Sequence, residues 1–156
     1  MMRLIGAAGI FLASLGVSRF FCSVEREKMQ CAEAFLELIR QIDRHIVCFN
    51  RPFPEIVRLL DPELRVTCRL SPTGENLEVM FDAASPPLPA GCERIVREFA
   101  HELGRSYRDE QIAACAAAIS ALDAETAAER RRLAERIRLI RCICLCGGLA
   151  VIILLI

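Results

Sequence analysis

Hydrophobic residues gather at the two ends of the chain, and a polar, charged stretch separates them. Leu4 to Val17 carries no charge, and Cys142 to Ile156 has neither a charge nor a strongly polar side chain. As a helix the C-terminal run would measure about 22 Å, against a hydrocarbon core of about 30 Å, and apolar neighbours lengthen it. We therefore predict transmembrane anchors at residues 1–22 and 139–156.

Each end also has a second interpretation. The N-terminal run has the length of a secretory signal, but Arg19, Phe20 and Phe21 occupy the place where small residues should precede a cleavage site. An uncleaved anchor is the better explanation. The alternative for the C-terminal run is a helix buried in a protein core.

Basic residues predict which side of the membrane the middle of the chain faces. Arg19, Arg26 and Lys28 follow the first apolar run, and Arg3 lies on its far side. The basic residues before the second run are Arg130, Arg131, Arg132, Arg136, Arg138 and Arg141. Lys and Arg are retained on the cytoplasmic side, so residues 23–138 are predicted to form a cytoplasmic helical domain.

The stretch from Arg130 to Arg132 has two interpretations. Together with Arg141, it is explained by topology alone. The same side chains are suited to bind anionic lipid headgroups or an acidic partner. We favour topology, and one residue can serve both purposes.

The first part of the middle region predicts one long helix followed by a short one. Apolar residues recur there at steps of three and four, which place them on one helix face: Phe35, Leu38, Ile42, Ile46 and Phe49. Pro52 should end this helix, because proline disfavours helical geometry in the residue before it. Pro54 to Leu60 can form a second, short helix.

Residues 65–91 differ in character from the rest. Ser71 to Gly74 is typical of a turn, and Pro86, Pro87 and Pro89 indicate an extended linker. The flanks, Arg65 to Leu70 and Asn76 to Asp82, alternate loosely between apolar and polar residues. An irregular segment and a small hairpin are equally compatible with this pattern.

The last part predicts a helix from Cys92 to Leu103, with Gly104 as its C-terminal cap, and then a very long helix capped by Asp109. The apolar stripe of the long helix is Ile112, Cys115, Ile119, Leu122, Leu133, Ile137 and Ile140. At ~1.5 Å per residue this helix would be about 70 Å long. The expected fold is mainly α: a membrane-anchored antiparallel bundle whose two long helices continue into N- and C-terminal transmembrane segments.

Composition argues against nucleic-acid binding and against a disulfide scaffold. The net charge is zero, Trp is absent and Tyr107 is the only tyrosine, so no basic, aromatic surface is indicated. Nine cysteines are an odd number, and several lie in apolar helical stretches. We expect reduced thiols that pack as small apolar side chains.

No group of residues predicts catalysis, a metal site or a cofactor. On a helix, residues two apart diverge by about 200°, so Cys144 points away from Cys142 and Cys146. His45 and His101 stand at no ligand spacing from another His or a Cys pair. Phosphate-binding loops and nucleophile motifs are absent from the sequence. The chain is expected to be non-enzymatic, and an enzyme hypothesis would rest on the cysteine cluster alone.

The ordered features resemble the stage III sporulation protein AB family of endospore-forming bacteria. The resemblance is densest in the second half, in Phe99, Leu103, Gly104, Arg105, Asp109, Gln111, Leu122 and the apolar tail from Leu149 to Ile156. The opening Leu4 to Ala7 and the segment Ile46 to Glu55 also match. The segment Arg65 to Gly91 departs from the family in being shorter and richer in proline.

The resemblance implies a platform component of the channel complex that links mother cell and forespore, located in the mother-cell membrane around the forespore. Such proteins are similar to the inner-membrane platform of type II secretion and would dock a secretion-type ATPase beside other stage III sporulation membrane proteins. By analogy the docking surface would comprise Gly104, Arg105, Ser106 and Asp109. The competing hypothesis is a membrane-tethered helical adaptor or sensor that binds another cytoplasmic partner or anionic lipid.

Overall fold

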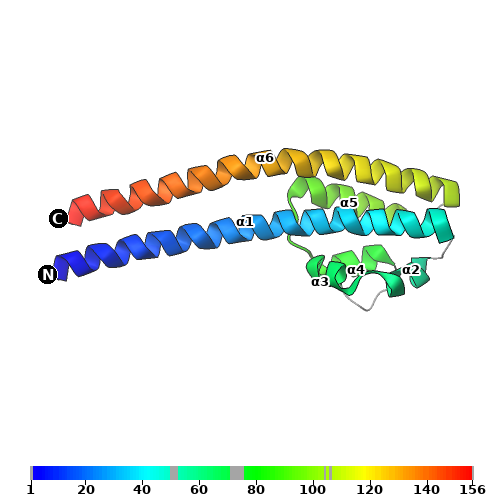
Figure 1. Ribbon diagram of the computed structural model, residues 1–156, viewed down its shortest axis with the longest axis horizontal. Helices are drawn as coiled ribbons and strands as arrows, with labels where there is room; N and C mark the ends of the chain where they lie inside the picture. The colour runs from blue at the N-terminus through cyan, green and yellow to red at the C-terminus, as the bar shows by residue number, and fades with distance from the viewer. Residues whose placement is uncertain (1, 50–52, 71–75, 104, 106, 156) are drawn as a thin grey trace. The chain divides into compact units, whose positions relative to one another are not determined.

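The computed structural model describes residues 2–49, 53–70, 76–103, 105 and 107–155. In this part of the chain every regular element is a helix, which confirms the mainly α class (Figure 1). The helices are α1 (Met2–Phe49), α2 (Phe53–Leu59), α3 (Pro62–Thr67), α4 (Leu77–Ala84), α5 (Ala90–Glu102) and α6 (Arg108–Leu155).

The chain divides into two compact units, and each is described by itself. Unit 1 comprises Met1–Glu27 and Arg130–Ile156, and unit 2 comprises Lys28–Glu129. In unit 2 the C-terminal part of α1 and the N-terminal part of α6 run antiparallel. Arg108 donates to the carbonyl oxygen of Val47 at 2.9 Å, and Arg40 pairs with Asp123 at 3.4 Å.

The predicted apolar stripe of α1 forms the centre of the core of unit 2. Phe35, Leu38, Ile42 and Ile46 are buried, as are Cys115 and Leu122 of α6. Phe49 is the exception, with 60% of its surface exposed. It is the last residue of α1, where the chain leaves the helix and the periodic pattern no longer determines which side faces the core.

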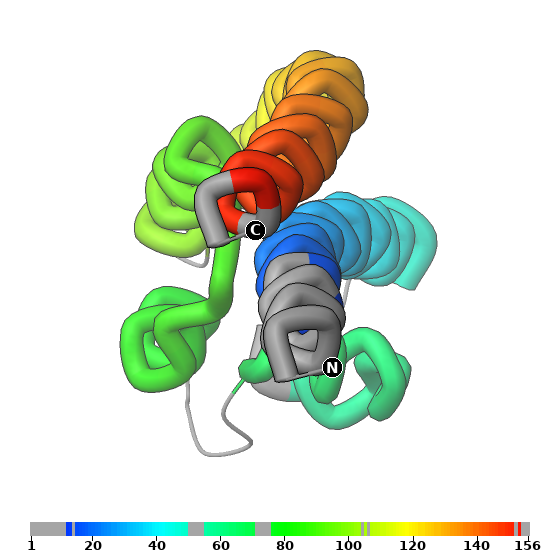
Figure 2. The backbone as a smooth tube through the Cα atoms, turned by 90° about the vertical axis from the view of Figure 1, so that its left-hand side faces the viewer, coloured from blue at the N-terminus to red at the C-terminus, as the bar shows by residue number. Residues whose placement is uncertain are grey.

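The short helices complete this core from the other side of α1. In both views α2 and α4 lie on one side of α1 and α6 lies on the opposite side (Figures 1 and 2). Phe81 of α4 contacts Phe35 of α1 edge to face, with ring centroids 5.7 Å apart. Ile56 of α2 is also fully buried. The predicted short helix at Pro54 to Leu60 is thus confirmed as α2.

The hairpin considered for residues 65–91 is wrong for the described residues, because helices α3 and α4 stand where its two strands were expected. Asp61 caps α3 by accepting from the backbone N–H of Glu63, and Pro62 starts the helix. In α4, Leu77, Met80 and Phe81 are buried together. Their spacing of three and four is helical, and burying that face outweighs the weak two-residue alternation around it. Residues 71–75, which include the whole predicted turn, lie outside the described residues.

Helix α5 is confirmed, and the predicted N-cap of the helix after it needs correction. Helix α5 ends at Glu102, and its C-cap residue Leu103 donates its backbone N–H to the carbonyl oxygen of Phe99. Gly104 lies outside the described residues. Asp109 lies in the first turn of α6, which begins at Arg108, and is therefore not its N-cap. A carboxylate in this turn still interacts favourably with the positive end of the helix dipole.

Unit 1 contains the first half of α1 and the second half of α6. Arg136 pairs with Glu25 at 3.7 Å within it. Large apolar side chains of this unit are exposed, among them Leu12, Phe20, Phe21, Leu139, Ile143, Leu149 and Ile153. Across the residues that the structure describes, no helix combines the length and apolarity needed to cross a membrane. The two anchors therefore stay a prediction.

Candidate docking surface

Arg105, the central residue of the predicted docking turn, belongs to a cluster of three side chains. One guanidinium nitrogen lies 2.7 Å from Nε2 of His101, and the other donates to Glu78 at 3.2 Å. Nδ1 of His101 lies 2.9 Å from the second oxygen of Glu78. The cluster joins α4, the end of α5 and the turn after it.

The chemistry of these groups fixes the direction of their hydrogen bonds. A guanidinium only donates, so Nε2 of His101 accepts, and the imidazole proton lies on Nδ1, where it is donated to Glu78. The hydrogen bond from His101, with the positive charge of Arg105 contributing, lowers the pKa of Glu78 below its usual value of 4.5. His101 and Arg105 are only four residues apart in the sequence, whereas nothing in the sequence connects Glu78 with them.

The turn continues into the start of α6, which is tied to the end of α1. The bond from Arg108 to Val47 satisfies a carbonyl in the last turn of α1, where carbonyl groups lack helical partners. Tyr107 is 86% exposed, and Asp109 is exposed beside it. Ser106, like Gly104, lies outside the described residues. Of the four predicted docking residues, the structure therefore places Arg105 and Asp109 on the surface near one turn.

The basic residues of α6 are all on the surface. Arg130, Arg131, Arg132 and Arg141 are exposed, as either a topological or a binding role requires. Their placement does not separate the two interpretations.

The cysteines are free thiols, and three of the buried ones have raised pKa values. Burial raises the pKa of Cys92 to about 11, with a further contribution from the nearby carboxylates of Glu125 and Glu129. Burial likewise raises the pKa of Cys115 to about 12, with Asp43 contributing. Burial also raises the pKa of Cys68. A thiol that stays protonated is a poor nucleophile and a poor metal ligand.

Metal binding finds no support in the described part of the chain. No group of three or more His, Cys, Asp or Glu side chains there is arranged to hold a metal ion. Cys142 and Cys146 are exposed and Cys144 is half-buried. His45 lies against the ring of Phe49, with centroids 5.7 Å apart, rather than near a second ligand.

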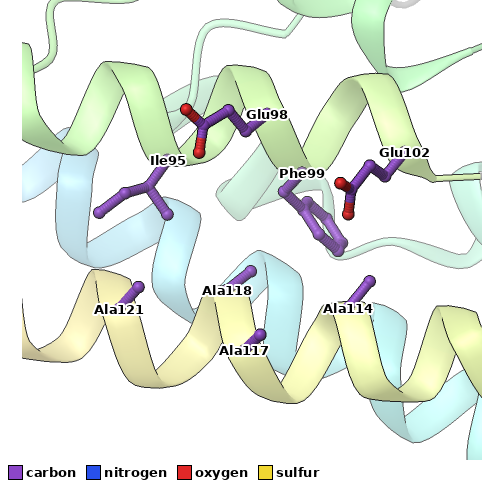
Figure 3. A pocket seen from close by; sticks show the side chains of 8 residues that line it. All are labelled: Ile95, Glu98, Phe99, Glu102, Ala114, Ala117, Ala118 and Ala121. Atoms are coloured by element: carbon purple, nitrogen blue, oxygen red, sulfur yellow. The ribbon is translucent and has the colours of Figure 1, made fainter.

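A groove between α5 and α6 was not anticipated from the sequence. Its volume is about 180 Å³. The residues that line it are Ile95, Glu98, Phe99, Glu102, Ala114, Ala117, Ala118 and Ala121. Figure 3 shows the alanine side chains of α6 directed toward α5, which carries the two glutamates. The available signal was four alanines at helical spacing, which sequence patterns alone do not separate from ordinary helix-forming residues.

Comparison with known proteins agrees with the suspected family. The family model described as stage III sporulation protein AB matches residues 83–156. The matched segment contains α5, the Arg105 turn, the groove and all of α6. Neither curated proteins nor solved structures gave a match to the chain. The description of this family refers to stage III of sporulation.

Proposed function

Because residues 83–156 match the stage III sporulation protein AB family, we propose that this chain is a non-enzymatic platform component of the mother cell–forespore channel complex. It docks a secretion-type ATPase from the cytoplasm. The family match carries the proposal, since the matched residues include the predicted docking turn.

The geometry of the turn suits a docking role. Glu78 and His101 hold the Arg105 guanidinium at the surface, and Tyr107 stands exposed two residues on. Arginine and tyrosine are enriched among the residues that dominate binding energy at protein interfaces, and pre-ordered side chains lose less entropy on binding.

Membrane attachment is the second part of the proposal. Apolar side chains such as Phe20, Ile143 and Ile153 are exposed in unit 1, and exposed apolar surface of this kind marks contact with a membrane or another protein. We place both ends of the chain in the mother-cell membrane around the forespore. The arginines next to the apolar runs favour a cytoplasmic location for unit 2.

The docking role is tested by measuring binding of the purified secretion-type ATPase to the full chain in lipid nanodiscs. Arg105→Ala should weaken binding by about tenfold, a change that ~1.4 kcal/mol produces. Arg94→Ala removes an exposed arginine from α5 and serves as the matched control. Equal affinity of the two variants would reject the Arg105 turn as the docking surface, provided that circular dichroism shows both to be folded.

The competing function is an adaptor that works through its basic residues, and the exposure of Arg130, Arg131 and Arg132 is compatible with it. Replacing these three residues by Gln should leave ATPase binding nearly unchanged if the platform proposal holds. Loss of binding in this variant, together with normal binding by Arg105→Ala, would support the adaptor instead.

A further inference from the structure

The groove between α5 and α6 has the shape of a binding groove for a helix. Its floor is made by alanines at positions i, i+3, i+4 and i+7 of α6, namely Ala114, Ala117, Ala118 and Ala121. Side chains this small allow another backbone to approach closely. Ile95 and the buried ring of Phe99 add apolar surface from α5 (Figure 3).

The rim of the groove carries two negative charges. Glu98 and Glu102 are exposed and four residues apart on one face of α5. Neither forms an ion pair with a side chain that the structure describes, whereas Glu93 on the same helix pairs with Arg97 at 3.0 Å. Like charges at this spacing destabilise a helix. A cation placed between them would relieve the repulsion.

The size of the groove argues against a small-molecule site. Ligand pockets usually measure about 300–1,000 Å³ and bury most of their ligand, whereas this groove holds about 180 Å³. A shallow groove with an apolar floor and a charged rim is suited to side chains of a protein partner.

We propose that this groove receives a basic helix of the docked ATPase. Small or apolar side chains of that helix lie on the alanine floor, and an arginine or lysine of the same helix lies between Glu98 and Glu102. The inference rests on the proposed function and deepens it, because it places the second part of the docking interface on α5 and α6. Charge complementarity decides the choice of a basic occupant.

Two kinds of variant test the groove separately from the Arg105 turn. Glu98→Gln/Glu102→Gln removes the charge of the rim, and Ala117→Leu/Ala121→Leu fills the floor at two exposed positions where leucine suits a helix. The matched controls are Glu135→Gln for charge and Ala116→Leu for bulk, because both residues are exposed on α6 and do not line the groove.

Affinity for the purified ATPase is measured with the full chain in nanodiscs, at low and at raised ionic strength. Both groove variants should bind about tenfold more weakly or worse, and both controls should bind as the unchanged chain does. The charge variant should also show a smaller loss of affinity on adding salt, since screening acts on the charges it lacks.

The outcomes distinguish the groove from the proposed function. If the unchanged chain binds the ATPase and both groove variants bind equally well, the groove is not part of the interface, although the docking role survives. If sedimentation shows that the variants instead alter self-association, the occupant is a second copy and the inference is wrong. If the unchanged chain does not bind the ATPase at all, the inference and the docking role both fail.

Discussion

Among single residues, Glu78 should make the stability of the fold depend on pH, because its carboxylate is held by His101 and Arg105 next to the candidate docking turn. A carboxyl group whose pKa is lowered in the folded state stabilises the fold above its unfolded pKa, and the effect is lost as pH falls through the folded value. For Glu78, held by His101 and Arg105, the contribution is present at pH 7 and declines below about pH 4.5.

We therefore predict a pH-dependent effect of Glu78→Gln. The variant should unfold at a lower temperature than the unchanged chain at pH 7, and this difference should shrink as the pH drops below about 4.5. Thermal unfolding followed by circular dichroism in detergent measures it. Glu135→Gln is the control, because it removes the same charge from an exposed residue without an ion pair in the described part of the chain. A constant difference at all pH values would show that the cluster does not stabilise the fold.

The same three residues show what the sequence reveals about a site. Arg105 is singled out by family resemblance, and His101 lies only four residues before it. Glu78 lies 27 residues before Arg105, on a helix that the sequence did not predict, so no local pattern connects them. Tertiary packing of α4 on α5 creates the cluster.

Among the helices, α4 can be tested with a substitution that should raise stability if the segment is a helix and lower it if the segment is a strand. Val79 is 54% exposed in the middle of this helix. In a helix, replacing an exposed valine by alanine stabilises by about 0.5 kcal/mol, because valine loses rotamer freedom there. In a strand the same change destabilises, since β-branched residues are favoured.

Val79→Ala should accordingly raise the unfolding temperature slightly. Val66→Ala, at an exposed position in α3, should act in the same direction and serves as the comparison. A lower unfolding temperature for Val79→Ala would favour the hairpin that the loose alternation of this segment suggested.

Long elements were the predictable part of the fold. The apolar stripe from Phe35 to Ile46 repeats over three helical turns, so a helix with this face buried is the one secondary structure that fits it. The structure buries this face. Short elements were harder, because Leu77 to Ala84 offers only two turns, and both helical and alternating patterns can be drawn through it. Phe49 and Asp109 lie at helix ends, where a displacement of one residue changes the role of a side chain.

For the whole molecule, the distribution of charge and apolar surface is compatible with partner docking by unit 2 and membrane contact by unit 1. Unit 2 has a continuous buried core and carries the Arg105 turn and the acidic groove. Unit 1 exposes large apolar side chains and carries the arginines from 130 to 141. A docking unit and a membrane-facing unit are what the platform proposal requires.

The role that we propose for this chain is to recruit a secretion-type ATPase to the membrane around the forespore. The most direct measurement is the position of a fluorescent ATPase fusion in sporulating cells that lack the chain and are complemented with variants of it. With the unchanged chain, we expect the fluorescent ATPase at the membrane that surrounds the forespore. Without the chain, or with Arg105→Ala at equal expression, we expect a diffuse signal. ATPase that reaches this membrane equally well in cells lacking the chain would contradict the account.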